Sequence, residues 1–176
     1  MILKTMKIAG LLAAMSLSGM AGAQEQSENR VTATSDWSVY VEASPRECWA
    51  VSSPVETINT RDGNTVDVNR GDIQLIIFFR PGDTIMGQIM FAGGYPFAPD
   101  SVVTARIGDA TYEFFTQGNF AWLPTPEDDA RMVAAMKRGA DATIVGRSAR
   151  GTQTSDKFSL IGFTAAVDEA ASRCAG

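Results

Sequence analysis

Short runs of alternating hydrophobic and polar residues, separated by turn-forming residues, characterise the chain from Asp36 onward. In DWSVYVEA, Trp37, Val39 and Val41 fall on one face of an extended strand. ECWAVSS is a second such run, and RDGN and NRGD provide the glycines that turns favour. This pattern predicts a fold built mainly from short β-strands.

The segment DIQLIIFFRPGD is the most hydrophobic strand candidate. Leu75, Ile77 and Phe79 would point to one face, while Ile76 and Phe78 would point to the other. Because both faces carry large apolar side chains, we expect this strand to be central, with a helix or a loop over its second face.

Two hairpins and two helices are indicated in the second half of the chain. One hairpin turns at Gly108-Asp109, and the other turns near Arg150-Gly151. For the first helix, Thr125 can cap the N-terminus, Pro126 suits the first turn, and Gly139 follows the last turn. The segment TAAVDEAASR predicts a second helix that closes the chain.

The N-terminus has the three parts of a secretory signal. Two lysines precede a hydrophobic run over residues 8–20, and the small residues Ala21-Gly22-Ala23 follow it. That run is shorter than the ~20 residues that a membrane-spanning helix needs. We therefore expect a signal peptide over residues 1–23, cleavage near Ala23, and a mature protein that is periplasmic or secreted.

The mature chain is predicted to be one acidic domain. Residues 24–35 are polar and predict a flexible leader, and residues 36–176, without a repeat or a linker, predict a single β-sandwich domain. Removing residues 1–23 takes away two lysines and no acid, so 15 basic residues fall to 13 against 20 acidic ones, a net charge of −7. This charge argues against nucleic acid or anionic lipid as partners. We expect no membrane span in the mature chain.

Both cysteines, Cys48 and Cys174, remain after cleavage. An exported protein can keep a disulfide, so we predict a Cys48–Cys174 bond that ties the last helix to the N-terminal part of the sheet. Two free buried thiols, or cross-links to another chain, are the alternatives.

The available side chains restrict the chemistry. The sequence has no histidine, which removes Ser-His-Asp and Cys-His catalysis and histidine-bound zinc. It also lacks a phosphate-binding loop, a dinucleotide fingerprint and a C-x-x-C motif. Carboxylates remain, but Glu127, Asp128 and Asp129 are adjacent, which suits the positive end of a helix better than an acid/base pair. We predict no catalytic residue, no metal and no cofactor.

The segment FAGGYPFAPDS is the strongest candidate for binding. Its Gly93-Gly94 pair and two prolines predict a stiff, irregular connection that carries Tyr95 and Phe97. Exposed aromatic side chains on such a loop suit partner binding. The alternative is that both rings pack under the loop and close the core. The hairpin tip RGTQTSD is a weaker candidate of the same kind.

Four segments resemble the invasion-associated locus B family of exported bacterial proteins. They are DWSVYVEA, ECWAVSSP, MKRGADATIVGRS and, most specifically, RGTQTSDKFSLIGFTAAVDEAASRC. The resemblance implies a mostly β fold, an immunoglobulin-like β-sandwich with two short helices, and a link to the bacterial envelope and to entry into host cells. Many relatives carry an extra cysteine after the DW strand, where this chain has Tyr40 and Val41.

We therefore expect an exported envelope or secreted protein that acts by binding and has no catalytic activity. Its partner would be a protein or a glycan at the cell envelope or at a host surface. The alternatives are a periplasmic structural or chaperone-like protein and a carboxylate-dependent glycan hydrolase.

Overall fold

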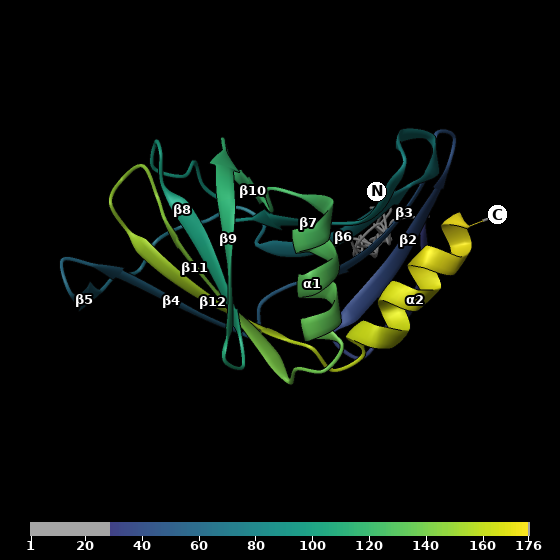
Figure 1. The fold of residues 1–176 in the computed structure, drawn as a ribbon. Coiled ribbons are helices and arrows are strands. Elements are labelled where there is room, and N and C mark those ends of the chain that lie inside the picture. Colours follow the sequence, from purple (N-terminus) through teal and green to yellow (C-terminus); the bar gives the residue numbers. More distant parts are fainter. Residues whose placement is uncertain (1–28, 176) are drawn as a thin grey trace, which may run out of the picture.

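The structure is a computed structural model that describes residues 29–175, so the predicted signal peptide, residues 1–23, lies outside the described residues. These residues form a 12-stranded sheet in which all paired strands are antiparallel, with two α-helices (Figure 1). From edge to edge, the strands are β1 (Arg30–Thr34), β2 (Trp37–Ala43), β3 (Arg46–Ser52), β6 (Gln74–Arg80), β7 (Ile85–Ala92), β10 (Phe120–Trp122), β9 (Ala110–Gln117), β8 (Val102–Ile107), β11 (Asp141–Arg147), β12 (Gln153–Ser159), β4 (Glu56–Arg61) and β5 (Asn64–Thr65). The helices are η1 (Pro81–Asp83, a short 3₁₀ turn), α1 (Pro126–Met136) and α2 (Phe163–Cys174).

The sheet forms a β-sandwich-like fold around one main core. β2, β3, β6 and β7 lie on one side of the molecule, and β8, β9, β11 and β12 lie on the other (Figure 1). Phe91 of β7 and Phe158 of β12 are fully buried and meet edge to face, with ring centroids 6.2 Å apart. Inward residues of both sides therefore share a single apolar interior. The predicted mostly β fold with two short helices is confirmed.

Strand β6 has two buried faces, as the sequence predicts. Leu75 and Ile77 face the main core, whereas Ile76 and Phe78 belong to a second apolar cluster on the other face. The predicted cover of a helix or a loop over this second face is wrong. Within the described residues, side chains of neighbouring strands, including Trp49 and Trp122, cover it instead.

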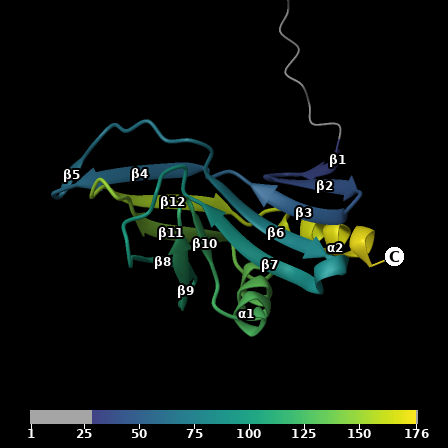
Figure 2. The same cartoon turned by 90° about the horizontal axis from the view of Figure 1, so that it is seen from above.

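Helix α2 packs across β2 and β3 at the end of the sheet opposite β5 (Figure 2). Its buried residues recur at helical spacing, from Phe163 through Ala166 and Ala170 to Cys174. The ring of Phe163 meets Trp37 of β2 at 4.9 Å. A disulfide joins Cys174 to Cys48 of β3, which confirms the predicted pairing and its role in holding the last helix.

Helix α1 begins where the sequence predicts. The Thr125 hydroxyl accepts a hydrogen bond from the backbone N–H of Asp128 at 3.2 Å. Asp129 is buried, and its Oδ1 accepts a hydrogen bond from the backbone N–H of Ile89 at 2.9 Å. One carboxyl of the acidic first turn therefore attaches the helix to β7. Burial raises the pKa of Asp129 to about 6, although the bond from Ile89 acts against this rise.

The predicted flexible leader over residues 24–35 is wrong for residues 30–34. These residues form β1, which pairs antiparallel with β2. A polar segment can form an edge strand because main-chain hydrogen bonds do not depend on the side chains. The carbonyl oxygen of Thr34 also lies so near Gly162, at the start of α2, that a Cβ on Gly162 would clash with it.

None of the helices within residues 29–175 is both long enough and apolar enough to cross a membrane.

Candidate functional site

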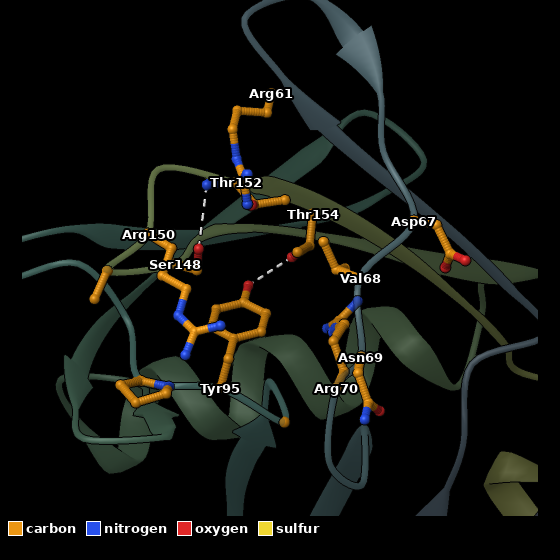
Figure 3. A pocket seen from close by; sticks show the side chains of 13 residues that line it. Arg61, Asp67, Val68, Asn69, Arg70, Tyr95, Ser148, Arg150, Thr152 and Thr154 are labelled. Carbon is orange, nitrogen blue, oxygen red and sulfur yellow. Dashed lines mark hydrogen bonds between the residues drawn. The ribbon is translucent and has the colours of Figure 1, made fainter.

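A pocket of about 510 Å³ lies beside β4, β12 and the turn that joins β11 to β12 (Figure 3). The segment before β6 and the connection after β7 complete its wall. Arginine and hydroxyl-bearing side chains dominate this wall: Arg61, Arg70, Tyr95, Ser148, Thr152 and Thr154. We call it the arginine pocket. Its volume lies within the range of about 300–1,000 Å³ that is usual for small-molecule sites.

The arginine pocket begins where the inward face of β12 changes from apolar to polar. Phe158, Asp156 and Thr154 alternate along that face, and only Phe158 belongs to the main core. On the adjacent strand β4, Asn59 is the register partner of Thr154, and Thr57 is the partner of Asp156. Cross-strand partners share a face of the sheet, so polar side chains of two strands meet there.

Arg70 and Asp156 form a buried ion pair beside the arginine pocket. Nη1 and Nη2 of Arg70 each lie 2.7 Å from a carboxylate oxygen of Asp156, and the two side chains are only 5% and 0% exposed. Nε and Nη2 also donate to the carbonyl oxygen of Gly93, while Nη1 donates to Asn59. These five hydrogen bonds match the five N–H donors of a guanidinium. Arg70 is therefore a structural residue with no donor left for a ligand.

Tyr95 forms one wall of the arginine pocket. Its hydroxyl shares a hydrogen bond of 2.6 Å with the Thr154 hydroxyl, and the Arg70 guanidinium lies over its ring, 4.9 Å from the centroid. Burial raises the pKa of Tyr95 above its usual value of 10, although Thr154 and Arg70 act against the rise. The phenol is therefore neutral near pH 7 and can donate or accept a hydrogen bond.

The binding hypothesis for Phe97 requires an exposed ring, but Phe97 is 6% exposed and belongs to the main core. It packs edge to face on Tyr95, with 5.0 Å between the ring centroids. Its backbone forms a bridge with Ser148, which holds the connection against the end of β11. Phe97 thus matches the core-packing alternative. Tyr95 reaches the pocket, and the role of Tyr95 in binding stays a prediction.

The connection after β7 is held by a close contact between two glycines. The N–H of Gly71 donates to the carbonyl oxygen of Gly94 at 2.8 Å. Gly94 has a φ of +73°, and a Cβ on it would lie 2.5 Å from the carbonyl oxygen of Gly71. Only glycine tolerates both conditions. This contact keeps the segment that carries Arg70 beside the one that carries Tyr95.

Arg61 and Arg150 are the arginines of the pocket that keep unused donors. Nη2 and Nε of Arg61 both donate to the Thr152 hydroxyl, at 2.6 and 3.2 Å. Arg150 is exposed on the turn between β11 and β12. Within residues 29–175, neither arginine forms an ion pair with an acid. One acid, Asp67, lines the pocket.

The weak candidate segment RGTQTSD supplies Arg150, Thr152 and Thr154 to the pocket and Asp156 to the ion pair beside it. Neither Arg61 nor Arg70 was predicted as a site residue from the sequence. Polar residues at alternating positions before Phe158 were a signal that an inward face becomes polar there. Nothing local indicated that Arg70 would meet Asp156. The part of the chain that the structure describes contains no group of three or more potential metal-ligating side chains.

The fold and the pocket define a disulfide-closed, β-sandwich-like protein with a cavity whose wall carries arginine and hydroxyl side chains. The family model described as Invasion associated locus B (IalB) protein matches residues 104–171. The crystal structure of invasion associated protein b from Bartonella henselae is similar, with a TM-score of 0.52 and 14% identity over 78% of this chain and 92% of that chain. At this identity the likeness shows the fold. No curated protein matches the chain.

The family match over residues 104–171 agrees with the resemblance predicted from the sequence, and the structural likeness agrees with the predicted fold. The family match and the disulfide also fit an exported protein.

Proposed function

We propose that this protein is an exported binding protein of the cell envelope or the extracellular space, and that the arginine pocket is its contact site. The observation that carries this proposal is the preorganisation of the pocket wall. One hydrogen bond joins Tyr95 to Thr154, and two join Arg61 to Thr152. The guanidinium of the Arg70–Asp156 ion pair packs over the Tyr95 ring. A fixed polar wall binds a partner without first having to be ordered.

Export is supported by the sequence pattern of residues 1–23 and by the disulfide, a bond that persists in oxidising compartments. The name of the Bartonella protein refers to invasion. For this chain, contact with a host surface is one form that envelope binding would take. A protein or a glycan would be the partner.

Binding fits the pocket better than carboxylate-driven hydrolysis of sugars does. That hydrolysis uses two carboxyl groups about 5–9.5 Å apart on either side of the scissile bond. Among residues 29–175, Asp67 is the one acid that lines the pocket, and both oxygens of the nearby Asp156 are engaged by Arg70. The proposal therefore assigns no catalytic activity to this site. A structural or chaperone-like role would not require a preorganised pocket.

Photo-crosslinking in the native envelope tests the proposal. A photoreactive residue replaces Arg150 at the pocket in one variant, and Arg106 in a control variant. Arg106 is also exposed, but it lies on β8 away from the pocket. We expect a discrete crosslinked product from position 150 and none from position 106. Equal products from both positions, or none from position 150, would contradict the proposal.

A further inference from the structure

The arginine pocket carries positive charge that the fold leaves uncompensated. Asp156 neutralises Arg70, so among the described residues that line the pocket the remaining charged side chains are two arginines, Arg61 and Arg150, and one acid, Asp67. The whole chain, in contrast, has a net charge of −5. A local excess of positive charge on an acidic protein attracts an anionic group to that position.

Arg61 and Arg150 both line the pocket and both have N–H donors left for an anion. Arg61 uses two N–H groups on Thr152, which fixes its guanidinium and leaves three donors of the five. Arg61 reaches the pocket from β4, and Arg150 reaches it from the turn between β11 and β12 (Figure 3). A planar guanidinium pairs best with a planar carboxylate through two parallel hydrogen bonds.

The rest of the wall carries hydroxyl groups. Ser148, Thr152 and Thr154 are buried, with exposures of 8%, 3% and 1%, and the Tyr95 hydroxyl lies beside Thr154. Hydroxyl groups both donate and accept, so they complement a ligand that itself carries many hydroxyls. Each of these hydroxyls already has one partner within the protein, and the second hydrogen bond that a hydroxyl can make remains for a ligand. A sugar ring can use this remaining capacity, whereas an apolar side chain of a protein cannot.

From these observations, we infer that the arginine pocket binds an acidic saccharide, with the sugar carboxylate on Arg61 and Arg150 and the sugar hydroxyls on Ser148, Thr154 and Tyr95. This inference rests on the proposed binding function, and it names the chemistry of the partner.

Calorimetric titration of the exported, disulfide-closed protein tests the inference. The probes are three acidic saccharides, namely oligogalacturonate, hyaluronate oligomers and sialyllactose, together with two uncharged counterparts, methyl-esterified oligogalacturonate and lactose. We expect at least one acidic probe to bind. Its uncharged counterpart should bind at least about tenfold more weakly, because the arginine–carboxylate hydrogen bonds are lost. For hyaluronate, the uncharged counterpart is a neutral oligosaccharide of the same length.

Two double variants with the same change in net charge separate the site from general electrostatics. Arg61→Gln/Arg150→Gln should weaken binding of the acidic probe at least about tenfold. Arg106→Gln/Arg138→Gln, which changes two exposed arginines outside the pocket, should leave binding within about twofold. Arg150→Gln alone changes an exposed side chain without a hydrogen-bond partner among the described residues, so its melting temperature should not change. It should still bind the probe several-fold more weakly.

Equal binding of acidic and neutral probes would overturn the inference, and so would equal losses in both double variants. If inorganic sulfate displaces the acidic saccharide at a concentration similar to the one at which the saccharide itself binds, the pocket is an anion site without sugar recognition. That result would also overturn the inference. If no acidic probe binds while position 150 still crosslinks to a partner, the saccharide assignment fails and the proposed binding function remains. If neither occurs, both fail.

Discussion

Arg70 and Asp156 lie 86 residues apart in the sequence, yet they form a bidentate ion pair beside the arginine pocket. Both N···O distances are 2.7 Å, and the two side chains are 5% and 0% exposed. The pair joins the segment before β6 to strand β12. Through Gly93, Arg70 also holds the end of β7.

Asp156→Asn should destabilise the protein by about 3–5 kcal/mol, because it leaves the buried charge of Arg70 without its counter-ion. Urea unfolding followed by tryptophan fluorescence would measure the loss. Asp141→Asn is the matched control, since it removes the acid of the exposed pair with Lys157, whose side chains are 44% and 46% exposed. That variant should change the free energy of unfolding by less than about 1 kcal/mol. Equal effects of the two variants would show that the buried pair is not structurally important.

Cys48→Ser and Cys174→Ser should each lower the free energy of unfolding by about 2–5 kcal/mol, because the disulfide closes a loop between residues 126 positions apart. The far-ultraviolet circular dichroism spectrum should stay that of a β-rich protein, since α2 also packs through Phe163 and Ala170. A tryptic map without reduction should show the two cysteine peptides linked. Free alkylation of both thiols in the folded, exported protein would contradict this prediction.

Asp129 should make the protein less stable as the pH rises from about 4 to about 6. The pKa of Asp129 is about 6 in the folded protein, against 3.8 for an ordinary aspartate, so within this window the folded state holds a proton that the unfolded state has lost. Raising the pH through the window therefore favours unfolding, by an amount on the order of 1 kcal/mol because solvent partly screens the first turn of α1.

Asp129→Asn tests this pH dependence. The amide oxygen can still accept the hydrogen bond from Ile89, and the charge is absent at every pH. In this variant, the free energy of unfolding should not decrease between pH 4 and 6 as it does in the unchanged protein. At pH 7 the variant should be at least as stable as the unchanged protein. If the free energy of unfolding changes with pH in the same way for both proteins between pH 4 and 6, Asp129 is not the cause of the pH dependence.

Gly94→Ala should destabilise the protein more than Gly63→Ala does. Both glycines have positive φ values, +73° and +79°, so both alanines bear the backbone strain of about 1–2 kcal/mol. Around Gly63 there is no heavy atom within 4 Å of the added Cβ, whereas at Gly94 that carbon would lie 2.5 Å from the oxygen of Gly71. The difference between the two melting temperatures isolates the close contact. Equal melting temperatures would show that the two segments separate at little cost.

Phe97→Ala should lower the free energy of unfolding by about 3–5 kcal/mol, because it leaves a cavity beside Phe91 and Tyr95.

Tyr95→Phe keeps the aromatic packing and removes only the hydroxyl that faces Thr154, so its effect on stability should be about 1 kcal/mol. It should nevertheless weaken partner capture. A stable Tyr95→Phe variant with unchanged capture would exclude the hydroxyl from the contact, and a stable Phe97→Ala variant would exclude a packing role for Phe97.

Local features of the chain were sufficient to predict much of the fold. The alternation around Trp37 and Val39 predicted β2, and the Thr125 cap predicted the start of α1, because strand period and helix capping depend on residues close together in sequence. The Cys48–Cys174 pairing was predictable because the chain has two cysteines. Strand β1 escaped prediction because main-chain pairing at an edge leaves little trace in a polar sequence.

The binding site, in contrast, depends on contacts between distant segments. Arg61, Arg70, Tyr95 and Thr154 come from four parts of the chain, and no periodicity links them. The composition of FAGGYPFAPDS indicated a rigid connection, but it could not show that Phe97 would be buried while Tyr95 would reach the pocket. That outcome depends on how the connection packs against β11 and β12, since burial is decided by the neighbours that folding brings together.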